Sequence, residues 1–369
     1  MRKVAVLGAN GFVGSRLFEV FHLEQIASVR AVVRTFGGLA GLARFDFDWR
    51  KADALDEEAM VQALEGCEAV VSCVNGEAAT IAGSAPVVYR AAARAGVKRL
   101  IYLSSFVVHG QAPAPGTEES APMSGKSPFW YNNAKVEAEH ALSTLLRDGR
   151  VEVVILRPGI VWGPRSPRWT VTLSNQLLAG VAAVVHDGGG ICNTIFVDNL
   201  VAAIQCAIES PTGAGEAFFV GDEETVTWLE FYGALAGLLG LSGEVIHRLE
   251  TPTFPPVRVS AKNRFDFLLN QPAFQRAVRI FPRRLKHPIR AAIASFLAGG
   301  RPTREASPWE ETAVPGPTIG HELCLLQECS WKIPHEKASR LLNYVPKVNA
   351  VEAWRRTAGW LQFAGYQTQ

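Results

Sequence analysis

Tyr131 and Lys135 are the residues whose types and spacing say most about possible chemistry. Four residues apart on a helix, the phenol and the ammonium share one face and lie one turn from each other. A free tyrosine ionises near pH ~10, too high for a base at neutral pH, but a nearby cation favours the phenolate and lowers that pKa. The pair is therefore a candidate for moving a proton on or off the oxygen of an alcohol or a ketone.

A glycine-rich segment near the start of the chain predicts where a nucleotide cofactor would bind. Gly8, Gly11 and Gly14 follow the apolar run Val4–Leu7 and open an amphipathic stretch. In a strand-to-helix turn the first glycine permits the tight turn, the second lets the backbone approach a diphosphate, and the third lets helix and strand pack closely. The helix N-terminus then offers free N–H groups and a positive dipole end to the phosphates.

Residues after the second and third strands bear on which cofactor binds. An acid after the second strand suits the ribose 2′-hydroxyl of NAD, whereas an arginine suits the 2′-phosphate of NADP. Arg34 stands there, which favours NADP, with NAD as the alternative and a solvated strand-end charge as the non-functional interpretation. Asp53, after the third strand, is a candidate acceptor for the adenine amino group. Asp56 is the better candidate for capping the helix that follows.

Short β-branched runs alternate with amphipathic stretches through residues 3–110, which is typical of a parallel sheet flanked by helices. The predicted fold class is α/β, a doubly wound parallel Rossmann sheet with a smaller, mostly helical C-terminal substrate domain. We expect the dinucleotide-binding domain to comprise residues 1–165 and 193–222, and the substrate domain to comprise 166–192 and 223–369. The expected strands are Val4–Leu7, Val29–Val33, Ala69–Cys73, Arg99–Ser104, Val153–Leu156 and Thr194–Val197, and the expected helices are Gly14–Phe21, Asp56–Leu64, Pro86–Ala95, Tyr131–Leu146 and Leu200–Glu209.

The composition, 369 residues with 48% hydrophobic and 20% charged, is that of a globular chain with a substantial core. A formal net charge of +2 argues against a nucleic-acid partner. Six cysteines without a CxxC pair indicate a reduced, intracellular protein, and no His, Cys and carboxylate cluster suggests a metal. No uncharged run reaches the ~20 residues of a transmembrane helix, so we expect a cytoplasmic protein.

Segment 257–304 is unusually basic, with eleven Lys or Arg and a single acid, Asp266, interspersed with apolar residues. Three interpretations stay open. The segment is a lid or packing insertion with a solvated basic face, a surface that rests on anionic lipid or admits a lipid-like substrate, or a pocket for an anionic substrate group with Arg258 or Arg264 as its clamp. The second interpretation would make the protein membrane-peripheral.

Together these motifs resemble the extended short-chain dehydrogenase/reductase family, which includes NAD(P)-dependent epimerases and dehydratases and the 3β-hydroxysteroid dehydrogenase branch. The resemblance covers residues 1–225 and 337–366. The motifs that carry it are Gly8–Gly14, Asp53, Leu103–Gly110, Tyr131–Lys135, Leu156–Gly159 and Phe196–Leu200.

The resemblance implies a role for individual residues. Ser105 would hydrogen-bond the substrate oxygen, Tyr131 would be the general acid or base, and Lys135 would bind the nicotinamide ribose hydroxyls and lower the pKa of the tyrosine. The cofactor-binding residues that it implies are Gly8, Asn10, Gly11, Phe12, Val13, Gly14, Arg34, Asp53, Ala54, Cys73, Val74, Tyr131, Lys135, Pro158 and Ile160. Cys73 and Val74 replace residues usual in the family, so their contacts near the nicotinamide ribose stay open.

Departures from the family pattern bear on the substrate. Phe106 and Val107 stand where nucleotide-sugar dehydratases carry an Asp-Glu pair, so that elimination lacks its acid and base. Ile160 and Cys192 stand where nucleotide-sugar epimerases usually place an asparagine and an arginine for the substrate diphosphate. The segment Arg157–Pro164 looks more like the 3β-hydroxysteroid dehydrogenase and dihydroflavonol reductase branches, which act on less polar substrates.

These residues favour an NADP-preferring oxidoreductase that interconverts a secondary alcohol and a ketone on an apolar or mid-sized small molecule. The first alternative is a nucleotide-sugar epimerase, which transiently oxidises its substrate with bound NAD(P). The second is a non-catalytic dinucleotide-sensing protein, against which the Tyr–Lys pair argues. Because family members often pair through two helices, here Pro86–Ala95 and Tyr131–Leu146, we also expect a homodimer.

Overall fold

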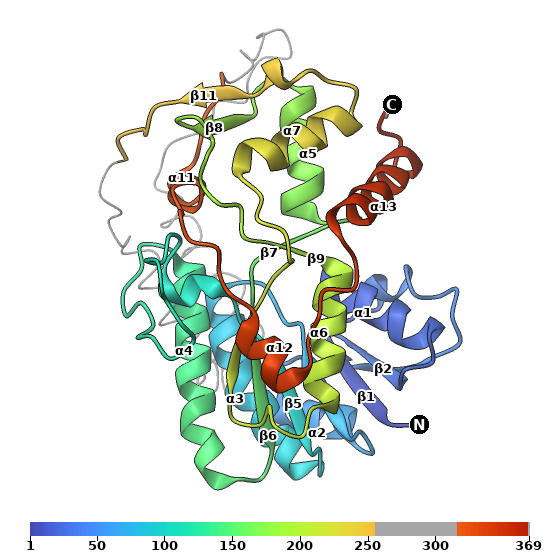
Figure 1. The fold of residues 1–369 in the computed structure, drawn as a ribbon. Helices are drawn as coiled ribbons and strands as arrows, with labels where there is room; N and C mark the ends of the chain where they lie inside the picture. Colours follow the sequence, from blue (N-terminus) through green and yellow to red (C-terminus); the bar gives the residue numbers. More distant parts are fainter. Residues whose placement is uncertain (255–315, 368–369) are drawn as a thin grey trace, which may run out of the picture. The chain divides into compact units, whose positions relative to one another are not determined.

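The computed structural model describes residues 1–254 and 316–367, so the basic segment 257–304 lies outside the described residues (Figure 1). The chain divides into two compact units, Met1–Thr253 with Pro317–Gln369, and Phe254–Gly316. All of the helices and strands named below belong to the first unit.

Seven strands form one parallel sheet in the order β10-β6-β5-β4-β1-β2-β3. They are β1 (Lys3–Leu7), β2 (Ser28–Val33), β3 (Asp48–Lys51), β4 (Ala69–Ser72), β5 (Arg99–Leu103), β6 (Glu152–Pro158) and β10 (Ala217–Val220). The chain extends the sheet in one direction from β1 to β3 and in the other from β4 to β10, so the order reverses between β1 and β4. Sheets of this kind bind ligands at the carboxyl ends of the strands beside the reversal.

Helices cover both faces of the sheet, as Figure 1 shows. The apolar sides of α2 (Glu57–Leu64), α3 (Ala78–Arg94) and α4 (Trp130–Leu145) share a core with one face, and those of α1 (Phe12–Leu23), α6 (Val197–Glu209) and α12 (Glu336–Leu342) share a core with the other. Both faces are buried, which explains why the central strands are nearly continuous apolar runs. The predicted doubly wound α/β fold is confirmed.

A third apolar core is built by segments that follow β5 and β6 and by the C-terminal part of the chain. Its regular elements include β7 (Ile160–Trp162), α5 (Leu173–Leu178), β8 (Ala183–Val185), α7 (Trp228–Leu238), α11 (His321–Gln327) and α13 (Ala350–Phe363). β7 pairs with β9 (Thr194–Phe196) and β8 with β11 (His247–Leu249). Short helical turns complete the chain: η1 (Phe36–Leu39), η2 (Phe106–His109), η3 (Leu146–Asp148), η4 (Pro167–Thr172) and η5 (Gly243–Val245).

Several elements differ from the sequence prediction. Helix α3 begins at Ala78, and Pro86, predicted to start it, lies inside the helix. The residues before Pro86 are mostly small, so they carry little amphipathic signal, and the proline merely lacks the N–H that would bond one turn back. Strands β7, β8, β10 and β11 were not predicted; β10 is a short edge strand that pairs with β6 alone.

The six cysteines are free thiols, four of them buried and two partly buried. Burial is the main cause that raises the pKa of every one of these thiols: Cys67, Cys73, Cys192, Cys206, Cys324 and Cys329.

Candidate functional site

The parallel sheet brings the predicted site residues to one edge. These residues are Gly8 after β1, Arg34 after β2, Asp53 and Ala54 after β3, Cys73 and Val74 after β4, Ser105 after β5 and Pro158 at the end of β6, with Ile160 opening β7. Helices α1 and α4 begin at this same edge, because each follows a strand of the sheet and returns to the start of another. Tyr131 therefore enters the site from the first turn of α4.

The glycine turn after β1 is tightly packed. Gly8 has a φ of +72°, and a Cβ atom on it would lie 2.9 Å from the carbonyl oxygen of Cys73. A Cβ on Gly14 would lie only 2.2 Å from the carbonyl oxygen of Gly8, whereas one on the exposed Gly11 would lie 3.3 Å from that atom. Gly8 and Gly14 are thus required by the packing of the protein itself, and Gly11 is the least constrained of the three.

The start of α1 fits a diphosphate. Gly11 is the N-cap in an extended conformation, and no side chain caps the helix. The N–H groups of Phe12, Val13 and Gly14 have no acceptor in the part of the chain that the structure describes. Open N–H groups and the positive end of the helix dipole form a ready anion site, and the missing side chain at Gly11 leaves it accessible.

The outer part of the predicted cofactor site is exposed. The side chain of Asn10 packs against η1, since a Cβ on Gly38 would lie 2.1 Å from the Asn10 Nδ2 atom. Arg34 is exposed and forms no hydrogen bond or ion pair within residues 1–254 and 316–367. The exposed Asp53 accepts a hydrogen bond from the Leu55 N–H at 3.0 Å. Asp56 caps α2, accepting from the Ala59 N–H at 3.2 Å, as predicted.

Ser105, Tyr131 and Lys135 lie together at the ends of β4 and β5. Ser105 opens η2, and its hydroxyl hydrogen-bonds the Tyr131 phenol. Lys135 is buried, its Nζ atom donates to the Leu103 carbonyl oxygen at 2.7 Å, and it lies 5.7 Å from the centre of the Tyr131 ring. The serine hydroxyl, the phenol and the ammonium are thus grouped beside the glycine turn.

The pKa of Tyr131 moves in the direction opposite to the one expected from the Tyr–Lys spacing. Burial raises the pKa of Tyr131 to about 12; the carboxylate of Glu322 adds to this, while the Ser105 hydrogen bond and Arg168 oppose it. Lys135 does not offset this rise, because its ammonium has already lost its proton at the pH where such a phenol ionises. Burial in turn lowers the pKa of Lys135 to about 8. Tyr131 is therefore a neutral phenol, a proton donor rather than a base, over the whole neutral range.

Comparisons with known proteins agree with this geometry. Residues 8–186 match the NAD(P)H-binding family model. The chain is 26% identical to UDP-glucose 4-epimerase of Vibrio cholerae over 64% of this chain and 75% of that protein. It is 27% identical to 2-alkyl-3-oxoalkanoate reductase of Stenotrophomonas maltophilia over 64% and 76%. The crystal structure of a Thermotoga maritima UDP-glucose 4-epimerase with UDP-glucose shares the fold, with a TM-score of 0.67, 18% identity and coverage of 98% and 99%.

The chain is thus similar to proteins of the extended short-chain dehydrogenase/reductase family. Like its relatives in this family it is an enzyme, and residues 8–186 form its NAD(P)H-binding domain.

The positions that depart from the family pattern lie in the third core. Phe106, Val107, Ile160 and Cys192 are all buried there, and the aromatic ring of Tyr131 packs against the same core. Burial raises the pKa of the Cys192 thiol well above its usual value, so this position carries no charge. The surroundings of the Tyr131 ring are accordingly apolar on this side.

One charged pair near Tyr131 was not predicted. Arg168 of η4 donates to a carboxylate oxygen of Glu322 in α11 at 3.1 Å, and both charges act on the Tyr131 phenol. The Phe129 ring, just before α4, contacts the His321 ring edge-on. No sequence motif predicts a role for Glu322, because α11 is placed near Tyr131 only by the packing of the third core.

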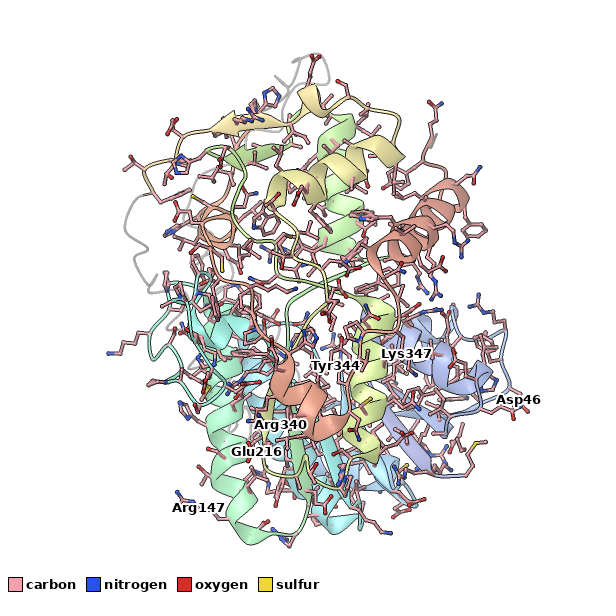
Figure 2. The ribbon with its side chains drawn as sticks, viewed as in Figure 1. Asp46, Arg147, Glu216, Arg340, Tyr344 and Lys347 are labelled. Carbon is pink, nitrogen blue, oxygen red and sulfur yellow. The ribbon has the colours of Figure 1, made fainter. Side chains whose placement is uncertain are left out.

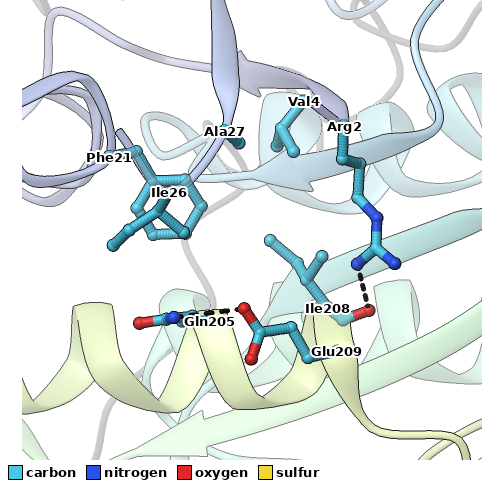
Figure 3. Close-up of a pocket in the computed structure, with 8 residues that line it drawn as sticks. All are labelled: Arg2, Val4, Phe21, Ile26, Ala27, Gln205, Ile208 and Glu209. Carbon is cyan, nitrogen blue, oxygen red and sulfur yellow. Dashed lines mark hydrogen bonds between the residues drawn. The ribbon is translucent and has the colours of Figure 1, made fainter. Parts of the chain in front are cut away.

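A cavity elsewhere in the protein is unrelated to this edge. It has a volume of about 220 Å³ and lies at the amino end of β1, near the carboxyl ends of α1 and α6 (Figure 3). Its lining residues are Arg2, Val4, Phe21, Ile26, Ala27, Gln205, Ile208 and Glu209. Among residues 1–254 and 316–367 there is no cluster of three potential metal ligands, and no helix of that part is long and apolar enough to cross a bilayer.

Proposed function

We propose that this enzyme is an oxidoreductase that interconverts a secondary alcohol and a ketone on an apolar or mid-sized small molecule, with NADP as its preferred cofactor. The observation that carries the proposal is the phenol of Tyr131, a partly buried residue, hydrogen-bonded to Ser105 beside the glycine turn. The apolar third core, which includes Phe106 and Val107, favours a substrate with little charge.

The chemistry divides between the cofactor and three side chains. A bound nicotinamide ring supplies or accepts the hydride. Ser105 would hold the substrate oxygen near the phenol, and Tyr131 would give its proton to that oxygen when a ketone is reduced. Lys135 would bind the ribose hydroxyls and stabilise the phenolate that is left. In the oxidation direction the same phenolate would take the proton from the alcohol.

The cofactor would lie along the edge of the sheet from β3 to β6. Its diphosphate would bind at Phe12, Val13 and Gly14, where the N–H groups are open. Asn10 and Gly11 would border the diphosphate, and Asp53 with Ala54 would meet the adenine. Cys73, Val74, Pro158 and Ile160 would surround the nicotinamide and its ribose.

Arg34 should decide between the two forms of the cofactor. We expect Arg34→Ala to raise the Kd of NADPH by about 10- to 100-fold, equivalent to the ~1.5–3 kcal/mol of a charge-assisted hydrogen bond. The Kd of NADH should stay within about twofold, since NADH lacks the 2′-phosphate. Fluorescence titration of the purified protein with each nucleotide measures both values.

The matched control is Arg147→Ala. Arg147 is also exposed, but it lies in η3, after the carboxyl end of α4 and so at the opposite edge of the sheet (Figure 2). This variant should bind both nucleotides like the native protein. Equal weakening of NADPH and NADH by Arg34→Ala would contradict the preference for NADP.

An epimerase acting on a nucleotide sugar is the second candidate, and the 26% identity to a UDP-glucose 4-epimerase favours it. One experiment separates the two candidates. Purified protein is incubated with UDP-hexoses and, separately, with a panel of ketones and NADPH. A dehydrogenase consumes NADPH in proportion to the ketone reduced, whereas an epimerase interconverts the sugars without added cofactor. Sugar interconversion with no ketone turnover would overturn the proposed function.

Two further expectations concern partners. A homodimer through α3 and α4 is proposed because the helices pack together and carry small and apolar residues. Light scattering at working concentration should give twice the monomer mass, and a monomer would contradict it. A membrane contact, a lid or an anion clamp in residues 257–304 stays a prediction.

A further inference from the structure

A buried ion pair lies one helical turn beyond Lys135. Glu139 follows Lys135 by four residues on α4, and Arg157 stands near the end of β6. Their side chains are 3% and 5% exposed. The Arg157 guanidinium donates from Nε to Oε1 at 3.0 Å and from Nη2 to Oε2 at 2.6 Å, so the contact is bidentate.

The remaining hydrogen bonds of the pair are also satisfied. The Ser104 hydroxyl donates to Oε1 of Glu139. Arg157 Nη1 donates to the Glu119 carbonyl at 2.8 Å and to His109 Nε2 at 3.0 Å, while Nη2 lies 3.7 Å from the Met123 sulfur. Because the guanidinium can only donate, His109 accepts with Nε2 and carries its proton on Nδ1, which lies 3.4 Å from the Pro122 carbonyl oxygen. Burial, and then Arg157, lower the pKa of His109, in keeping with a neutral ring.

Such a pair needs a reason other than stability. Removing two ions from water costs several kcal/mol each, and well-packed apolar residues often replace a buried ion pair without loss of stability. The position of Glu139, on the stripe of α4 that carries Tyr131 and Lys135, offers that reason.

Lys135 is a buried cation with little else to keep it charged. Burial lowers the pKa of Lys135 to about 8, and the Glu139 carboxylate is the main influence that opposes this. The other groups around its ammonium are the Leu103 carbonyl, the rings of Tyr102 and Tyr131, and the Cys73 thiol. Burial raises the pKa of Tyr102 and that of Cys73, so both stay neutral. Among these groups in the described part of the chain, Glu139 is the one anion.

We propose that Glu139 is a positioning residue that keeps Lys135 protonated in the neutral range, and that Arg157 and Ser104 hold its carboxylate in place. The proposal deepens the proposed function and rests on it, since a charged Lys135 is what that site needs to hold ribose hydroxyls and a phenolate. Glu139 itself would touch neither substrate nor cofactor.

The direct test is the titration of Lys135, followed by NMR of the lysine ε-carbon in ¹³C-lysine-labelled protein, with Lys135→Arg to assign the signal. In Glu139→Gln the midpoint should fall by about one pH unit or more, as expected when an opposite charge is withdrawn. The Kd of NADPH should rise at high pH as Lys135 loses its proton, and in Glu139→Gln this rise should begin at a correspondingly lower pH. Both readouts are independent of any substrate, so they stand even if the proposed reaction is wrong.

Glu139→Gln alone leaves Arg157 buried without its acid and risks misfolding. A double variant therefore tests whether Glu139 sets the titration of Lys135. Glu139→Gln with Arg157→Met removes both charges and should fold, yet Lys135 should still titrate at the lower pH. The matched control is Glu152→Gln, which breaks the Arg99–Glu152 pair at the amino ends of β5 and β6 and should leave the titration unchanged. A folded double variant whose Lys135 titrates as in the native protein would overturn the proposal and leave the pair a purely structural contact.

Discussion

Replacing Tyr131 with phenylalanine should lower kcat for ketone reduction by about 10²- to 10⁴-fold, the range that a positioned proton donor contributes. The ring is retained, so packing against the third core should not change. NADPH binding should also stay close to native, because the open N–H groups at the start of α1 do not involve the phenol. Steady-state kinetics on a reduced ketone and fluorescence titration with NADPH provide the two measurements.

Tyr366→Phe is the matched control for this experiment. Its hydroxyl hydrogen-bonds Asn175 Oδ1 at 3.0 Å, and it belongs to the C-terminal part of the third core. It should lose no more than about twofold in kcat, because a single surface hydrogen bond contributes ~0.5–1.5 kcal/mol to stability and nothing to proton transfer. Full turnover by Tyr131→Phe would remove the phenol from the mechanism.

The second large effect is expected at the glycine turn, where two neighbouring glycines should behave differently. Gly14→Ala places a Cβ at 2.2 Å from the Gly8 carbonyl and should lower the free energy of unfolding by ~1–3 kcal/mol or more. Gly11→Ala meets that atom at 3.3 Å and should cost no more than ~0.5–1 kcal/mol. It should nevertheless raise the Kd of NADPH by about tenfold or more, since a methyl group would stand where the diphosphate approaches.

Urea denaturation and NADPH titration of both variants test this separation. Gly359→Ala is the control, because Gly359 lies on α13 with nothing within 4 Å of its added Cβ. It should leave binding unchanged and raise stability by ~0.5–1 kcal/mol, the usual gain of alanine over glycine in a helix. If Gly11→Ala bound NADPH as the native protein does, the start of α1 would not be the diphosphate site.

The sequence predicts the sheet well because its strands are buried on both faces and its helices are amphipathic. The runs Val4–Leu7 and Val29–Val33 therefore appear nearly as expected, as β1 and β2. The start of α3 could not be predicted in this way, because the residues that precede Pro86 are small, and the packing of α3 against α2 and α4 is not visible in the local sequence.

In the candidate site, too, features set by local sequence could be predicted and features set by tertiary packing could not. The Tyr131–Lys135 spacing and the glycine turn are local patterns, so the sequence alone indicates both. Glu322 acts on Tyr131 from a helix far along the chain, and its contribution depends on tertiary packing. The direction of the Tyr131 pKa also depends on burial, which a spacing of four residues does not reveal. The position of Glu139 could have been predicted from the sequence, because it follows Lys135 by four residues and so lies on the same face of the helix as Tyr131 and Lys135.

The six thiols have a practical consequence for studying this enzyme. Thiolates, not thiols, attack electrophiles, and burial keeps all six protonated in the native fold. Maleimide or iodoacetamide should therefore modify the folded protein slowly, and the stability of the fold does not depend on a disulfide. The number of alkyl groups per molecule, counted by mass spectrometry, therefore measures the fraction of a sample that has unfolded.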